Sequence, residues 1–217
     1  MPDGGADAPG GGADAPGGGA DAPRGYRTEG DLAAGSAEVL ELLVDRLEDY
    51  KAQVHRVPGR EVGTVVARLA AEVPGDAARP RVVVPAGLEP AWVAALSDGG
   101  ATVVVDTPEA PLSPTDLDQT AGVVTAARVA VAETGTIVLD ASPDQGRRAI
   151  SLVPDVHVCV VRADQVVQTV PEAVRLLAAH PERPLTWISG PSATSDIELN
   201  RVEGVHGPRT LHVVLVG

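Results

Sequence analysis

The 217-residue sequence predicts an α/β fold in which a mixed, mostly parallel sheet is flanked by helices. Two observations support this. The first is a series of short, β-branched and almost continuously apolar segments, such as RVVV at 81–84 and VHVCVV at 156–161. Strands of this kind are typical of a sheet covered on both faces. The second is that these segments alternate with helical patterns, which implies crossover connections between parallel strands.

The amino-terminal half begins with a helix from Ser36 to about Gln53, because apolar residues recur there at helical spacing. Ser36 is the expected N-cap of this helix. The next expected elements end at Pro-Gly pairs or turn residues. In order, they are an extended segment Val54–Val57, a helix Val62–Val73, a strand Arg81–Val84, a helix at about Pro90–Leu96 and a strand Ala101–Val105.

The carboxyl-terminal half repeats the alternation. Its expected elements are a strand Val156–Val161, a helix Pro171–Ala179, a strand Leu185–Ser189 and a strand Leu211–Val216. The stretch Val131–Leu139 alternates more strongly between polar and apolar residues and contains a glycine. Either an antiparallel pair or a bulged strand explains that pattern.

The first 30 residues differ from the rest of the chain. The hexapeptide GGADAP occurs at 4–9, 11–16 and 18–23, and the segment contains no Val, Leu or Ile. Such a segment cannot bury enough apolar surface to offset the entropy lost on ordering. We therefore expect residues 1–30 to be a disordered tail, either a solvated extension or an interaction arm, and residues 31–217 to form a single domain.

Composition excludes several classes of function. The chain has 30 acidic and 17 basic residues, a formal charge of −13, which argues against nucleic acid as a partner. Its single cysteine excludes a disulfide framework and a cysteine-rich zinc or iron–sulfur site within the chain. No basic-apolar leader and no apolar run of about 20 residues is present, so we expect a cytoplasmic protein without membrane insertion.

Three segments carry residues suited to chemistry. In the first, Glu133, Thr134 and Thr136 surround Gly135 within a strand-like run. Glycine permits close approach of a ligand or of another backbone, so this segment is either a pocket wall or an ordinary turn.

The second segment, at 189–198, follows an apolar strand and supplies Gly190, Ser192 and Thr194. Hydroxyls and free backbone N–H groups at a helix start favour a carboxylate or phosphate, although a capped loop explains the pattern equally well. In the third segment, His206 precedes Gly207 before the last strand. A histidine on such a turn suits acid–base chemistry, or it simply hydrogen-bonds nearby backbone.

Other candidates are more ambiguous. Arg147 and Arg148 follow a Pro-Asp-Gln-Gly loop and suit either an anionic substrate or a solvated helix start. His157 and Cys159 lie in an apolar strand, where His157 is expected to be a core or edge residue and Cys159 a buried one. No spacing of His, Asp and Glu resembles a metal site, and no dinucleotide-binding glycine fingerprint follows a strand.

The stretches AVAETGTIVL (130–139), VPDVHVCVVRADQVV (153–167), WISGPSATSDIE (187–198) and GVHGPRTLHVVLV (204–216) together resemble the LUD-domain family, specifically its lactate utilization protein C branch. The resemblance covers roughly residues 36–217. It implies the α/β fold type shared by ribose-5-phosphate isomerase, glucosamine-6-phosphate deaminase and CoA transferases. It also implies a role in oxidising L-lactate to pyruvate within a multi-protein system whose iron–sulfur clusters are carried by partner subunits.

Three functions remain open at this point. In the first, the chain is the subunit without iron–sulfur clusters or other cofactor, with a pocket for a small carboxylate. In the second, it is an independent enzyme of the CoA transferase or isomerase type that uses Glu133 and His206 as catalytic groups. In the third, it senses an organic acid without turnover. For the pocket we expect Thr134, Gly135, Thr136, Gly190, Ser192, Thr194 and Gly207 to contact the ligand.

Overall fold

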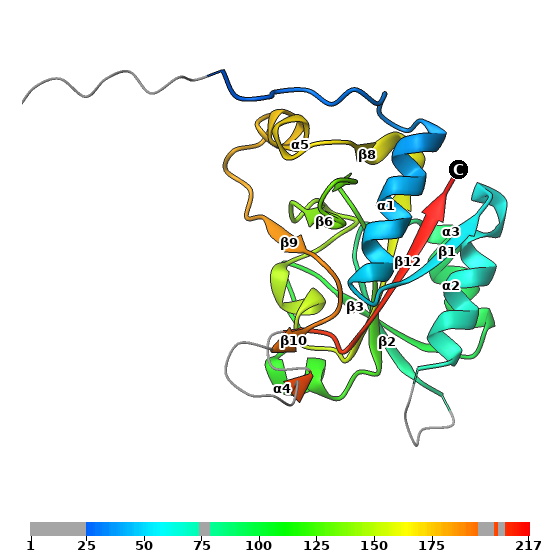
Figure 1. Ribbon diagram of the computed structural model, residues 1–217. Helices are drawn as coiled ribbons and strands as arrows, with labels where there is room; N and C mark the ends of the chain where they lie inside the picture. The colour runs from blue at the N-terminus through cyan, green and yellow to red at the C-terminus, as the bar shows by residue number, and fades with distance from the viewer. Residues whose placement is uncertain (1–24, 74–78, 195–201, 204–206) are drawn as a thin grey trace, which may run out of the picture.

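The structure is a computed structural model that describes residues 25–73, 79–194, 202–203 and 207–217. Its centre is a six-stranded sheet with the order β1-β12-β7-β4-β2-β3, and every neighbouring pair is parallel (Figure 1). The strands, from one edge to the other, are β1 (Gln53–Val57), β12 (Thr210–Val216), β7 (Val156–Arg162), β4 (Gly122–Ala126), β2 (Arg81–Pro85) and β3 (Thr102–Asp106). The predicted α/β class is confirmed.

A second sheet of four short strands has the order β8-β5-β6-β9. Its strands are β8 (Val166–Val167), β5 (Val129–Val131), β6 (Thr136–Leu139) and β9 (Thr186–Ile188). β5 and β6 form an antiparallel hairpin, so of the two interpretations of the 131–139 stretch the antiparallel pair is the right one. The antiparallel part of the mixed architecture lies here, together with a two-stranded pair formed by β10 (Ala193–Thr194) and β11 (Val202–Glu203).

Five α-helices occur in the described residues. They are α1 (Ala37–Asp49), α2 (Val62–Ala71), α3 (Pro90–Asp98), α4 (Pro114–Asp118) and α5 (Val170–Leu177). Ser36 caps α1 as predicted, because its side chain accepts a hydrogen bond from the Val39 N–H at 3.3 Å. Short 3₁₀ turns occur at Gly59–Glu61, Arg148–Ser151 and Ala163–Gln165.

The layers follow from the alternation of side chains along the central strands. On β12, Val214 packs with the residues of α2 and α3 on one face, whereas Val213 and Leu215 pack with α1 and the second sheet on the other. α5 covers the outer face of the second sheet. In Figure 1, α1 lies in front of β12, with α2 and α3 to one side of it and the second sheet to the other. The core is built from Val, Leu, Ile and Ala, as expected of a chain without phenylalanine.

Besides the two-residue strands β8, β10 and β11, the elements β4 and α4 have no counterpart among the predicted ones. β4 is fully buried at the centre of the six-stranded sheet, and α4 is held by a capping box between Ser113 and Asp116. At the amino-terminal end, Glu29 accepts a hydrogen bond from Arg175 of α5. Residues 1–24 of the expected tail lie outside the described residues. Among the described helices, none has the length and apolarity needed to cross a bilayer.

Candidate functional site

A pocket of about 200 Å³ lies between the six-stranded sheet and the segment that contains β9. His157 and Leu211, the second residues of β7 and β12, form its floor on the side of the central sheet. The loop after β9 forms the opposite wall, and the 3₁₀ turn Arg148–Ser151 closes a third side. The lining residues are Arg148, Ser151, Leu152, His157, Thr186, Trp187, Ile188, Ser189, Gly190, Pro191, Ser192, Gly207, Pro208 and Leu211.

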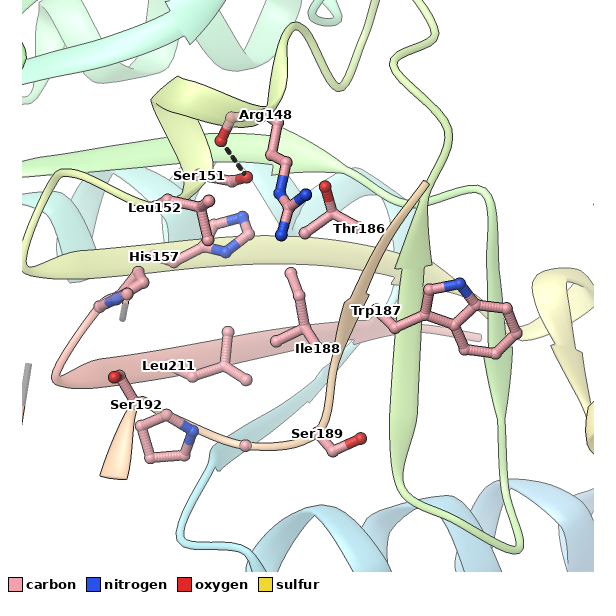
Figure 2. A pocket seen from close by; sticks show the side chains of 14 residues that line it. Arg148, Ser151, Leu152, His157, Thr186, Trp187, Ile188, Ser189, Ser192 and Leu211 are labelled. Carbon is pink, nitrogen blue, oxygen red and sulfur yellow. Dashed lines mark hydrogen bonds between the residues drawn. The ribbon is translucent and has the colours of Figure 1, made fainter. Parts of the chain in front are cut away.

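Arg148 is the charged residue among those lining residues. Its guanidinium extends between the ring of His157 and the side chain of Thr186 and points toward Ile188 (Figure 2). Within the part of the chain that the structure describes, this guanidinium has neither a hydrogen-bond acceptor nor a carboxylate partner. The neighbouring Arg147 differs, because it binds both carboxylate oxygens of Asp106 and the backbone oxygen of Leu112. Of the two arginines that the sequence left undecided, Arg148 is therefore the one available to an anion.

His157 supplies a buried polar group to the pocket. Its Nε2 lies 2.8 Å from Oγ1 of Thr125 on the neighbouring strand β4, and the residue is 1% exposed. Complete burial lowers the pKa of His157 to about 4, because the imidazolium would lose its hydration. The ring is consequently neutral at physiological pH. The sequence indicated a core or edge histidine; the structure shows a core position that also borders the pocket.

Three of the residues expected at a ligand site line this pocket: Gly190, Ser192 and Gly207. Gly190 has a φ of +86°, and a Cβ there would lie 2.7 Å from the backbone oxygen of Tyr50. The glycine is therefore required both by its conformation and by the close approach of the loop to the end of α1. Thr194 belongs to β10, two residues beyond Ser192, whereas His206 lies outside the described residues.

The Glu-Thr-Gly-Thr segment lies in and beside the turn of the β5–β6 hairpin. Its two hydroxyls are close to the pocket but behind its wall: Oγ1 of Thr134 donates to Oγ1 of Thr136 at 2.8 Å, and Thr136 lies 2.7 Å from Oγ of Ser189. This chain of hydroxyls fixes the Ser189 side chain. Thr134 and Thr136 thereby position the wall rather than face the cavity.

Glu133 lies outside the pocket and is bound by residues of two other segments. Its carboxylate accepts hydrogen bonds from Nη1 of Arg27 and from Nε2 of Gln168, both at 3.0 Å, and it does not line the pocket. Gly135 has a φ of +56°, and a Cβ there would lie 2.8 Å from Cβ of Arg46. Of the two possibilities for this glycine, the structure thus shows close approach to another backbone, that of α1.

Cys159 faces away from solvent. The residue is 0% exposed, and burial raises the pKa of its thiol to about 12. The thiol therefore remains protonated and behaves as a core residue, as the sequence indicated. Across the described ranges, no group of three His, Cys, Asp or Glu side chains is arranged to hold a metal ion.

Together these groups suit the binding of a small anion. A guanidinium is a bidentate donor that matches a carboxylate, and hydroxyls and a neutral imidazole accept or donate single hydrogen bonds. The pocket is smaller than the sites of drug-sized ligands, so its volume suits a molecule of a few heavy atoms. Sequence reasoning missed Ser151 and Thr186, for which the sequence carries no signal, since they reach the pocket only through the packing of separate elements.

Comparison with known proteins gives concordant matches. A chain from Deinococcus radiodurans named "Lactate utilization protein C" is 51% identical over 183 residues, which cover 83% of this chain and 81% of that one. A "Lactate utilization protein C" from Bacillus subtilis is 33% identical over 99 residues, or 43% of this chain and 41% of that one.

A solved structure also matches. The crystal structure of a DUF162 family protein from Deinococcus radiodurans superposes with a TM-score of 0.69 at 44% identity, covering 86% of this chain and 99% of that chain. The model of the LUD domain matches residues 40–216, which include both sheets and the pocket. The chain therefore belongs to the LUD domain family.

Proposed function

We propose that this protein acts in lactate utilization and that its pocket between the two sheets binds a small carboxylate, with Arg148 as the anchor for the carboxylate group. The observation that carries the proposal is the guanidinium of Arg148, which extends into the pocket without a partner among the described residues. The name shared by relatives at 51% and 33% identity supports lactate, or a close analogue of it, as the carboxylate.

The electrostatics of the pocket favour this kind of ligand. No acidic side chain is among the described lining residues, so none of them neutralises the positive charge of Arg148. His157 is uncharged, and Ser151 and Thr186 are 2% and 7% exposed. A carboxylate placed here forms a charge-assisted pair with Arg148, which is itself exposed, beside these buried polar groups.

The proposal includes partner subunits that carry the iron–sulfur clusters. Oxidation of lactate to pyruvate removes two electrons, and the single cysteine of this chain is buried with a protonated thiol. A thiolate from Cys159 is thus not available as a cluster ligand. We therefore place electron transfer on other chains of the same system and assign binding of the acid to this one.

The test of the pocket is calorimetric titration with L-lactate and with lactamide, its uncharged amide. We expect the wild-type protein to bind lactate and to discriminate against lactamide. Arg148→Gln should weaken lactate binding about ten- to a hundredfold, because one charge-assisted contact is worth roughly 1.5–3 kcal/mol. Arg60→Gln is the matched control, because its side chain is 81% exposed on a surface 3₁₀ turn.

Equal affinity of wild type and Arg148→Gln for lactate would refute the anchoring role. A cellular version replaces the chromosomal gene with the same two variants and scores growth on lactate as the carbon source, where only Arg148→Gln should fail. The partner proposal is tested by affinity purification from lactate-grown cells. Recovery of iron–sulfur proteins with this chain supports it, and consistent recovery of the free chain overturns it.

A further inference from the structure

A second cavity, of about 350 Å³, lies outside the carboxyl ends of β2, β4 and β7. The first pocket lies near the amino ends of β7 and β12, so the two cavities are at opposite ends of the parallel strands. Gly87 follows β2, Arg128 follows β4, and Arg162 ends β7, and all three line the second cavity. Asp144 and Gln145, from the connection between β6 and β7, form the remaining wall. Its volume falls within the range of ligand pockets.

The position of this cavity is set by topology. After β2 the chain passes through α3, whose Leu96 packs on the face of the sheet that carries α2. After β4 it enters the β5–β6 hairpin, whose Ile137 packs on the other face. Neighbouring strands whose connections leave to opposite faces open a crevice at their carboxyl ends, and ligands of open α/β sheets bind in such crevices.

Backbone hydrogen bonds at the ends of β2 and β4 hold the segment that contains Asp144 in place. The N–H of Gly87 donates to the Pro143 oxygen at 2.9 Å, and the N–H of Ala126 donates to the Asp144 oxygen at 3.0 Å. A Cβ at position 87 would lie 2.5 Å from Pro143, so the contact requires glycine. The connection is thus fixed to the ends of β2 and β4, and it places a carboxylate between them.

The Asp144 carboxylate is poorly satisfied by the described residues. One side-chain donor reaches it, Nε2 of Gln145 at 3.3 Å, and no ion pair is formed. Burial raises the pKa of Asp144, and this effect outweighs the hydrogen bonds from its own backbone N–H and from Gln145, which lower the pKa. The hydrogen bonds to this half-buried carboxylate come from the Gln145 side chain and from the backbone N–H of Asp144 itself, so acceptor capacity is left for a ligand.

The two arginines are also available. Nε of Arg128 lies 3.8 Å from Asp140, and the rest of its guanidinium has no acceptor within the described part of the chain. Nε of Arg162 pairs with Asp164 at 3.0 Å, but both side chains are more than half exposed. An exposed pair of this kind is worth about 0–1 kcal/mol, so an anionic ligand displaces it at little cost.

We propose that this crevice is a second ligand site that takes a hydroxylated organic anion, with the anionic group on Arg128 and Arg162 and a hydroxyl donating to Asp144. The site is separate from the pocket between the two sheets, and no residue that the structure describes lines both cavities. It does not depend on the identity of the acid bound by Arg148.

The test is calorimetric titration with citrate and with tricarballylate, which carry the same carboxylates and differ by the hydroxyl. Wild type should bind citrate at least about tenfold more tightly, because a hydrogen bond to a charged group is worth roughly 1.5–3 kcal/mol. Asp144→Asn should reduce that preference, and Arg162→Gln should weaken both ligands. Glycerol 3-phosphate is the third probe, and its affinity relative to citrate tells whether the site prefers phosphate or carboxylate.

Two controls separate this proposal from the previous one. Arg60→Gln should bind citrate as wild type does, and Arg148→Gln should keep the preference for citrate over tricarballylate, since neither residue lines the crevice. Asp144→Asn is expected to fold normally, because it removes a charge that burial disfavours, and a urea titration verifies this. The proposal is overturned if citrate and glycerol 3-phosphate both fail to saturate the protein, or if citrate binding responds to Arg148→Gln and not to Asp144→Asn or Arg162→Gln.

Discussion

His157 should make the protein measurably less stable in mild acid. Its ring is fully buried with a pKa of about 4, whereas an unfolded chain protonates histidine near 6.5. Between these values the unfolded state binds more protons than the folded state, so stability rises with pH across this window. The full effect, reached below about pH 4, is on the order of 3 kcal/mol, and from pH 7.5 to pH 5.0 it amounts to roughly 2 kcal/mol.

The measurement is urea unfolding of the wild type and His157→Gln at both pH values. Wild type should lose about 2 kcal/mol more than the variant on acidification, because the variant lacks the titrating ring. The buried His212 and the partly buried His55 are present in both proteins, so their contributions cancel in the difference. His180→Gln removes an exposed imidazole three residues beyond α5 and should behave as wild type. Equal losses for wild type and His157→Gln would refute the assignment of a neutral buried ring.

Two further changes test the walls around the pocket. Gly190→Ala places a Cβ 2.7 Å from the Tyr50 oxygen at a φ of +86°, and we expect a loss of roughly 2–3 kcal/mol in urea unfolding; an unchanged midpoint would contradict the close approach. Arg147→Ala leaves the Asp106 carboxylate, 3% exposed, without its partner. Because the arginine itself is 38% exposed, we expect a loss of about 2 kcal/mol rather than the value for a fully buried pair, with Arg60→Ala within 0.5 kcal/mol of wild type.

The sequence predicted the alternation of strands and helices because each of those elements carries its own local signal. The N-cap at Ser36, the apolar runs and the Pro-Gly pairs all depend on neighbours within a few residues. β4 was missed because it lacks such a local signal at its carboxyl end. It is followed after only Ala127 and Arg128 by β5, and no Gly or Pro between them marks the boundary. The pairing of β4 between β2 and β7 is a long-range property that local periodicity does not encode.

The candidate site was predictable only in part. Gly190 was identified because glycine gives a loop backbone freedom, and Gly207 because glycines beside a histidine indicate a tight turn; both signals are local and visible in the sequence. The environment of Glu133 was not, because the residues that bind it, Arg27 and Gln168, lie 106 and 35 positions away. His157 carried no distinguishing signal either. It lies within an apolar strand, and the placement of β9 opposite that strand makes it a pocket residue.

The adjacent arginines show how the fold resolves what the sequence left open. Arg147 is in extended conformation, with φ −73° and ψ 153°, directly before the 3₁₀ turn that begins at Arg148. This change of conformation sends the two side chains to different places. Arg147 is held by the buried carboxylate at the end of β3, whereas Arg148 enters the pocket. Since the first arginine fixes the start of the turn, it also fixes where the second one points. A substitution at 147 should therefore lower stability and ligand affinity together, while one at 148 should affect affinity alone.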